Sequence, residues 1–196
     1  MKTLYDRYKK LDINGSFICL EKVKRNVSYF CYPTNAKPIG FEGCVMYCFI
    51  KPYGEMVFAS NPETSAESYV YPLARTFEDF LRLILECGST NPIEQVIWMN
   101  KEQFEKHLQS EEANRTDEQK KLLRYLEIEL GLSPIENPYE YVKDIQSDFD
   151  SSGIQYSNEY YDTLGIDNAT KTSSIPDFCE TVTVIKNQSN KDFSID

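Results

Sequence analysis

The sequence predicts an α+β protein, with a mostly antiparallel sheet of about five to six strands and a helical layer formed by the middle and C-terminal segments. Two observations lead to this fold class. Short runs rich in aromatic and β-branched residues, separated by turn residues, fill much of the chain before Thr76. From Thr76 onwards, apolar residues recur at spacings of three and four behind capping residues, which is the pattern of helices that pack on a core.

The predicted strands alternate with loops that contain proline, glycine or polar residues. Residues 1–12 precede them and are expected to form a short, weak helix. Pro33–Gly43 carries two prolines and two glycines, so we expect a loop there. The segment from Lys51 to Gly54 suits a hairpin turn, because proline and glycine preset turn dihedrals. Strands are expected at Ser16–Leu20, Val27–Tyr32, Cys44–Ile50, Glu55–Ser60, Ser68–Leu73 and, late in the chain, Thr181–Ile185.

The helix after the strands has the clearest start signal. Thr76 is an N-cap candidate, and Asp79 three residues later makes a variant of the capping box. Gly88 is the expected C-terminal residue of this helix. Its buried stripe is predicted to contain Phe77, Phe80, Leu81 and Ile84, broadened by Leu83 and Leu85. Further helices are expected to start at Asn91-Pro92, Asn100, Thr116 and Asn137-Pro138, with a final helical turn at Asn158–Leu164.

Composition bounds the domain organisation and the partners. We expect one domain over residues 1–185 and a flexible polar tail over residues 186–196. The formal net charge of −10 argues against binding to nucleic acid or to an anionic membrane, and it permits a basic protein partner. The sequence shows neither a signal-peptide h-region nor an apolar run of the roughly 18 residues that a membrane-spanning helix needs, so we expect a cytoplasmic protein.

No pattern in the sequence points to catalysis, a cofactor or a metal. His107 is the only histidine, and its spacing from Phe104 and Leu108 places it on an apolar helix face, where packing is the expected role. Cys44 and Cys48 have a metal-like spacing, but in a strand they would lie ~13 Å apart, too far for one zinc ion. We therefore predict reduced cysteines, mostly in the core, and no catalytic residue, cofactor or metal site.

An acidic row is the most specific polar pattern. On the helix predicted from Pro138, Glu140, Asp144 and Asp148 fall at i, i+4 and i+8, away from the apolar face. Like charges at this spacing destabilise a helix slightly. The row is either an ordinary solvated face or an electrostatic docking surface for a basic protein, which would mainly raise the association rate and the specificity.

Tyrosines follow the acidic row along the chain. Tyr156, Tyr160 and Tyr161 lie close together in sequence, and tyrosine is frequent both at interfaces and at the edges of cores. We take Tyr160 and Tyr161, together with the three acids of the row, as the predicted partner-binding residues.

The stretch Cys44–Leu85 resembles the SUKH superfamily, which contains fungal cell-wall-synthesis regulators and bacterial immunity proteins. The resemblance lies in consecutive strands over Val45–Phe49, Glu55–Ala59 and Tyr69–Leu73, followed by a Phe-x-x-Phe-Leu helix that begins at Phe77. It implies an α+β domain that binds another protein and has no catalytic residues. In bacteria such proteins commonly neutralise toxins, often nucleases, many of which are basic. No site residue transfers individually, because the motif residues are core residues.

Three functions are therefore compared. The first is a non-catalytic cytoplasmic protein-binding module, in its most specific form an immunity protein that neutralises a basic toxin such as a nuclease. The alternative is a carboxylate-based hydrolase with a cleft between the sheet and the helical layer, in which two acids converge with separated pKa values. The third is a structural subunit of a larger complex, which would show a contiguous exposed apolar patch.

Overall fold

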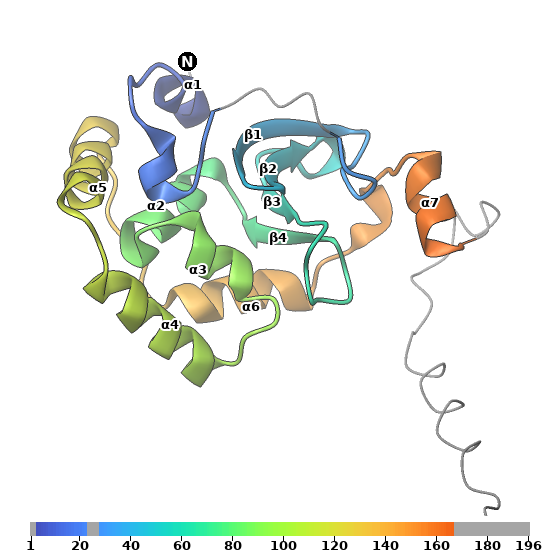
Figure 1. Cartoon of the computed structure of the whole chain (residues 1–196). Helices are drawn as coiled ribbons and strands as arrows, with labels where there is room; N and C mark the ends of the chain where they lie inside the picture. Colours follow the sequence, from blue (N-terminus) through green and yellow to red (C-terminus); the bar gives the residue numbers. More distant parts are fainter. Residues whose placement is uncertain (1–2, 23–27, 167–196) are drawn as a thin grey trace, which may run out of the picture.

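The computed structural model describes residues 3–22 and 28–166, and in this part of the chain a four-stranded antiparallel sheet packs against a group of helices (Figure 1). The α+β class predicted from the sequence is confirmed. The elements in chain order are α1 (Leu4–Tyr8), the 3-10 helix η1 (Gly15–Ile18), β1 (Ala36–Glu42), β2 (Val45–Ile50), η2 (Lys51–Tyr53), β3 (Val57–Ser60), β4 (Val70–Ala74), α2 (Phe77–Cys87), α3 (Thr90–Gln95), α4 (Lys101–Ala113), α5 (Asp117–Leu130), α6 (Pro138–Ser147), η3 (Ser151–Gly153) and α7 (Asn158–Leu164).

The strands form a meander in the order β1-β2-β3-β4, each antiparallel to the next. The expected loop at Pro33–Gly43 was wrong, because it contains β1. Two features explain how proline and glycine fit there. β1 is an edge strand, and its register shifts between Pro38 and Gly40, so the missing N–H of proline falls at a bulge on the edge.

Two expected strands are not formed in the described residues. The strand expected at Ser16–Leu20 was wrong, because the chain forms the 3-10 helix η1 there. The α-carbon of Gly15 lies so near the chain that a Cβ would sit 2.1 Å from the carbonyl oxygen of Leu20, which is too close for any side chain. Of the strand expected at Val27–Tyr32, the described residues 28–32 contain a turn at residues 30–31 and no strand. Thr181–Ile185 and the tail over residues 186–196 lie outside the described residues, in which the sheet has four strands rather than five to six.

The helix signals are mostly confirmed. The side chains of Thr76, Asn100 and Thr116 each accept a backbone hydrogen bond at the start of α2, α4 and α5. Gly88 and Gly131 end α2 and α5. The predicted stripe of α2 is buried along its whole length. The predicted start at Asn91 was wrong by two residues, because the side chain of Ser89 caps α3 instead.

Both faces of the sheet are buried, and the residues of β2, β3 and β4 alternate between two separate apolar clusters. The first cluster is shared with α1 to α6 and takes Tyr47, Val57, Ala59, Tyr71 and Leu73 from the strands. The second lies on the opposite face and contains Met46, Cys48, Ile50, Phe58 and Val70.

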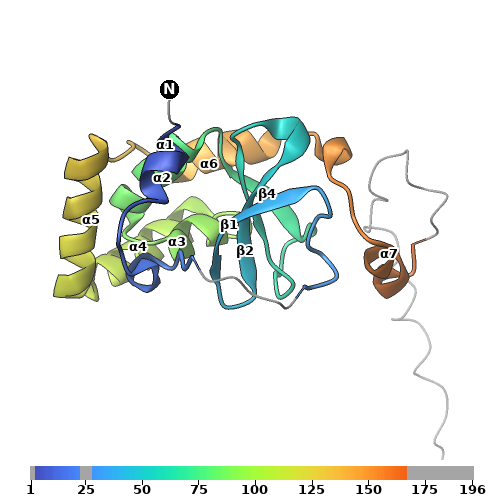
Figure 2. The same ribbon diagram turned by 90° about the horizontal axis from the view of Figure 1, so that it is seen from above.

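The second face is covered by the segment that follows α6. Ile154 belongs to the second cluster, and Phe149 and Tyr156 pack against it. Hydrogen bonds fix this segment to the loop before β1: the N–H of Thr34 donates to the carbonyl oxygen of Gln155 at 2.7 Å. Figure 2 shows the segment leaving α6 and reaching the side of the sheet away from α5. The chain therefore crosses from the helical side to cover the other face.

Both edges of the sheet are also protected. At the β4 edge, the Gln146 side chain in α6 donates to the carbonyl oxygen of Pro72 at 3.2 Å, and Pro72 has no N–H to leave unpaired. At the β1 edge, Glu21 and Phe41 exchange two backbone hydrogen bonds of 2.9 Å. α6 is thus held against the β4 edge by a hydrogen bond from a side chain to the main chain as well as by apolar packing.

The second cluster makes a measurable contribution to stability. We expect Ile154→Ala to lower the free energy of unfolding by about 2–5 kcal/mol, because Ile154 is 8% exposed and its truncation leaves a cavity over the sheet. Urea denaturation followed by circular dichroism measures this change. Ile128→Ala, at a side chain that is 62% exposed on α5, is the matched control and should change stability by less than about 0.5 kcal/mol. Equal, small effects of the two substitutions would show that the segment after α6 does not seal a core.

Candidate protein-interaction surface

α6 presents the acidic row to solvent. The helix starts at Pro138, which is buried and occupies the first helical position, where its missing N–H costs nothing. Val142 and Ile145 are buried on the inner face. Glu140 and Asp144 lie exposed on the outer face, and Asp148 caps the C-terminal end and is exposed as well. The structure therefore brings the three predicted acids to one side of one helix.

Two acids of the row have basic partners within the protein. Lys101, at the start of α4, donates to Glu140 at 2.8 Å, and Arg75, after β4, donates to Asp144 at 2.5 Å. All four side chains are more than half exposed, so these ion pairs contribute little to stability. The side chain of Asp148 makes no hydrogen bond or ion pair with residues 3–22 and 28–166. Sequence spacing identified the acids but not these partners, which come from distant segments.

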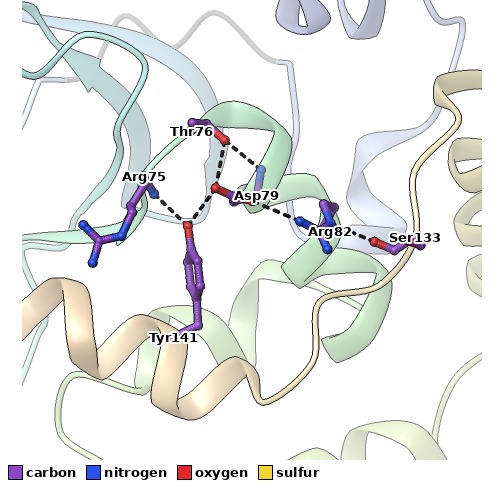
Figure 3. Close-up of polar contacts among 6 residues, drawn as sticks. All are labelled: Arg75, Thr76, Asp79, Arg82, Ser133 and Tyr141. Atoms are coloured by element: carbon purple, nitrogen blue, oxygen red, sulfur yellow. Dashed lines mark hydrogen bonds and ion pairs between the residues drawn. The ribbon is translucent and has the colours of Figure 1, made fainter.

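A polar cluster fixes α6 relative to α2 (Figure 3). The hydroxyl of Tyr141 donates to Oδ2 of Asp79 at 2.9 Å and accepts the backbone N–H of Arg75 at 3.1 Å. The same Asp79 oxygen accepts the hydroxyl of Thr76 at 3.0 Å, and Oδ1 accepts from Arg82 at 3.3 Å. Burial raises the pKa of Tyr141, so its hydroxyl stays protonated and keeps donating. The N-cap region of α2 thereby holds the helix that carries the acids.

A groove opens beside the C-terminal end of α6, between that end and the turn that joins β2 to β3. Its volume is about 240 Å³. Apolar and aromatic side chains make the walls, and carboxylates stand among them. The groove is lined by Tyr53, Met56, Arg75, Asp144, Ile145, Asp148, Phe149 and Asp150. Two members of the acidic row therefore border an apolar depression, which the sequence did not indicate.

The predicted tyrosines are used mainly within the protein. The ring of Tyr160 stacks on that of Tyr156, with centroids 3.8 Å apart and planes 9° apart, and it also contacts Phe30 and Tyr69. Tyr161 is half-buried with its ring edge-on to Tyr160 at 5.4 Å. These contacts attach α7 to the segment before β1 and to Tyr69, the residue that precedes β4.

The acids and the tyrosines do not form one continuous cluster. Figures 1 and 2 both show α7 beyond the sheet, separated from α6 by η3 and an extended segment. The structure brings Glu140, Asp144 and Asp148 together and places Tyr160 and Tyr161 elsewhere.

A buried carboxyl group joins the helices to the sheet. Glu94 on α3 is 5% exposed, and its Oε1 accepts hydrogen bonds from the hydroxyl of Tyr71 and, at 2.8 Å, from the amide of Asn61. Burial raises the pKa of Glu94, and the two hydrogen bonds oppose the rise. This group satisfies polar atoms at the contact between layers, and sequence reasoning missed it.

A second carboxyl group lies near the N-terminal end of α3. Glu42 accepts from the hydroxyl of Tyr47 at 3.4 Å, and burial raises its pKa. Burial, with the nearby Glu42 carboxyl, also raises the pKa of Cys19 to about 12. At neutral pH this cysteine is therefore a thiol, which is a poor nucleophile.

The remaining chemistry candidates are the histidine and the cysteines. His107 is half-buried on α4. Cys31, Cys48 and Cys87 are buried in the core, whereas Cys19 and Cys44 are partly exposed, and all five are free thiols. Within the described residues, no group of three or more histidine, cysteine or acidic side chains is arranged to hold a metal ion. Cys179 lies outside those residues.

Comparison with models of protein families, with curated proteins and with solved structures finds no match to this chain. In the part of the chain that the structure describes, none of the helices combines the length and the apolar character needed to cross a bilayer.

The first test of the site asks whether the hydrogen bonds of the Tyr141 hydroxyl hold α6 in place. We expect Tyr141→Phe to lower the free energy of unfolding by about 1–2 kcal/mol, because it removes a hydrogen bond to a carboxylate and leaves the Arg75 N–H without its acceptor. Thermal and urea unfolding measure the loss. Tyr125→Phe, on a ring that is 40% exposed on α5, removes the same atom at the surface and should be neutral. An unchanged Tyr141→Phe variant would mean that this cluster does not hold α6.

The buried Glu94 gives a pH-dependent test. The ordinary glutamate pKa is about 4.3, and the folded protein holds the proton more tightly. Stability contributed by this group is therefore present at low pH and lost as the pH rises from about 4 through the raised folded pKa. Glu94→Gln keeps the accepting oxygen and cannot ionise. The unfolding free energy of the native protein minus that of this variant should thus fall as the pH rises over this window.

Urea unfolding at a series of pH values measures this difference. Gln109→Asn, at an exposed position on α4, is the control and should give a flat difference, because neither side chain ionises. A flat difference for Glu94→Gln as well would contradict the raised pKa.

Proposed function

We propose that this protein is a non-catalytic, cytoplasmic protein-binding module whose partner is a basic protein. The observation that carries the proposal is the exposed row of Glu140, Asp144 and Asp148 on α6, a helix held in place by the edge of the sheet and by the Tyr141–Asp79 hydrogen bond. A fixed helix presents charges at defined positions, which favours a specific complex. The net charge of −10 adds long-range attraction for a basic partner.

The ion pairs within the row are compatible with this role. Lys101 and Arg75 are exposed, and exposed pairs exchange partners at small cost. Cations of the partner can therefore replace them at Glu140 and Asp144, while Asp148 is available without such an exchange. Tyr161, half-buried on α7, would add a contact at the rim, and Tyr160 would act mainly by keeping α7 in place.

The most specific form of the proposal is an immunity protein that neutralises a basic toxin such as a nuclease. This form rests on the resemblance of Cys44–Leu85 to the SUKH superfamily and on the acidic charge alone. An inhibitor of this kind needs a rigid surface and no reacting group.

A carboxylate-based hydrolase is the second candidate, and one observation favours it. Glu94 and Glu42 both have raised pKa values, and neither is bonded to a lysine or arginine within the described residues. Glu94 lies between the sheet and the helical layer, where such a cleft was expected. Its 5% exposure leaves little access for a substrate. Loss of a hydrolytic activity in Glu94→Gln, with stability retained, would favour this candidate over the binding module.

Capture of the partner tests the proposed function. The full chain is immobilised, exposed to a lysate of its native host and eluted with a salt gradient, and bound proteins are identified by mass spectrometry. We expect a stoichiometric basic protein that is released by moderate salt, because exposed charges are screened beyond about 8 Å at physiological ionic strength. The triple variant Glu140→Gln, Asp144→Asn, Asp148→Asn should lose at least tenfold in affinity for that protein.

A matched variant separates the site from overall charge. Glu102, Glu105 and Glu112 are exposed on α4, and their replacement by glutamine changes the net charge equally. This variant should keep most of the affinity. Equal losses in the two variants would show that charge acts without a defined site, and binding that ignores both salt and the α6 substitutions would overturn the proposal.

A further inference from the structure

The groove at the end of α6 has the form of a site for one side chain. Its volume of about 240 Å³ is smaller than the roughly 300–1,000 Å³ typical of small-molecule pockets. Tyr53, Met56 and Phe149 are half-buried along its walls. Apolar walls of this size suit a long aliphatic or aromatic group inserted from outside.

The groove is preformed. The hydroxyl of Tyr53 donates to the carbonyl oxygen of Asp150 at 2.7 Å and accepts the N–H of Gly153 at 2.8 Å. The rings of Tyr53, Phe58 and Phe149 lie 5.2–5.3 Å apart in a mutually packed triad. These contacts join the β2–β3 turn to the segment after α6, so little conformational entropy remains to be lost when a ligand binds.

The charges at the groove favour a cation. Three carboxylates line it, those of Asp144, Asp148 and Asp150, against one guanidinium. That guanidinium, of Arg75, is paired with Asp144. The Asp150 carboxylate accepts the N–H and hydroxyl of Ser152, each at 2.9 Å, and these bonds lower its pKa, so it is ionised at neutral pH. Two negative charges therefore remain beside apolar walls.

We propose that this groove binds a single arginine side chain of the basic partner, an inference that rests on the proposed function and locates its central contact. The aliphatic stem of arginine would cover Met56 and Ile145. Its flat guanidinium would lie against the ring of Phe149 or Tyr53 and near the carboxylate of Asp148. Arginine fits better than lysine, because a planar cation stacks on aromatic rings and is more weakly hydrated than an ammonium group.

An NMR titration of the full-length, ¹⁵N-labelled protein tests the inference. The probe is acetyl-Gly-Arg-Gly-amide, and the comparison probe carries citrulline, which has nearly the shape of arginine without its charge. We expect saturable shifts for residues that line the groove with the arginine probe, none with citrulline, and weaker binding of the lysine analogue. Asp148→Asn should weaken arginine binding by about two- to fivefold, the range for an exposed ion pair.

Two further variants make the result specific. Asp162→Asn, at an exposed position on α7, changes the charge equally and should leave binding unchanged. Phe149→Leu keeps an apolar wall without the ring, and it should reduce the preference for arginine over lysine. Saturable shifts elsewhere on the surface, or equal shifts with citrulline, would overturn the groove as the site while the proposed function stands. No saturable shift would also overturn the inference, and the proposed function would then be decided by the capture experiment.

Discussion

The burial of both faces of the sheet is the constraint on which the rest of the structure depends. Each residue of β3 and β4 is buried, so the sheet needs apolar cover on two sides. α2 and its neighbours supply one cover, and the segment around Ile154 supplies the other. The chain must therefore pass an edge of the sheet on its way from one face to the other. α6 makes this passage along β4, and Gln146 satisfies a carbonyl group of that edge strand as it does so.

The position of the candidate interface follows from this passage. A helix that covers a sheet edge turns one side inward, here with Val142 and Ile145, and leaves its other side to solvent. The acids on that side destabilise the helix little, since Lys101 and Arg75 are paired with Glu140 and Asp144 and offset the repulsion between the carboxylates. The groove arises where the helix ends and the chain bends toward the second face. Fold and candidate site thus share one cause, and a substitution that loosens α6 would affect both.

Features that depend on neighbours in sequence were predicted well. The caps of α2, α4 and α5 were identified because a side chain bonds a backbone N–H only three residues away. Features set by distant contacts were not. The prolines and glycines of β1 have the composition of a loop, and only pairing with β2 at the sheet edge makes a strand of them. The buried position of Glu94 could not be predicted from the sequence, because its hydrogen-bond partners Tyr71 and Asn61 are distant in sequence and belong to another layer. The exposure of the acidic row was foreseen from helical spacing, whereas its ion pairs and the groove required the fold.

The late position of the second cover has a consequence for synthesis on the ribosome. The sheet is complete in sequence at Ala74, whereas Ile154 follows only after five further α-helices, α2 to α6, and the 3-10 helix η3. At roughly 5–20 residues per second, translation leaves Phe58 and its apolar neighbours without their cover for several seconds. During that interval the nascent chain exposes the apolar face of the sheet that contains Phe58, and such a face can associate with other chains. Such a chain is a natural client for chaperones that bind emerging polypeptides, and its yield in a cell would depend on their supply.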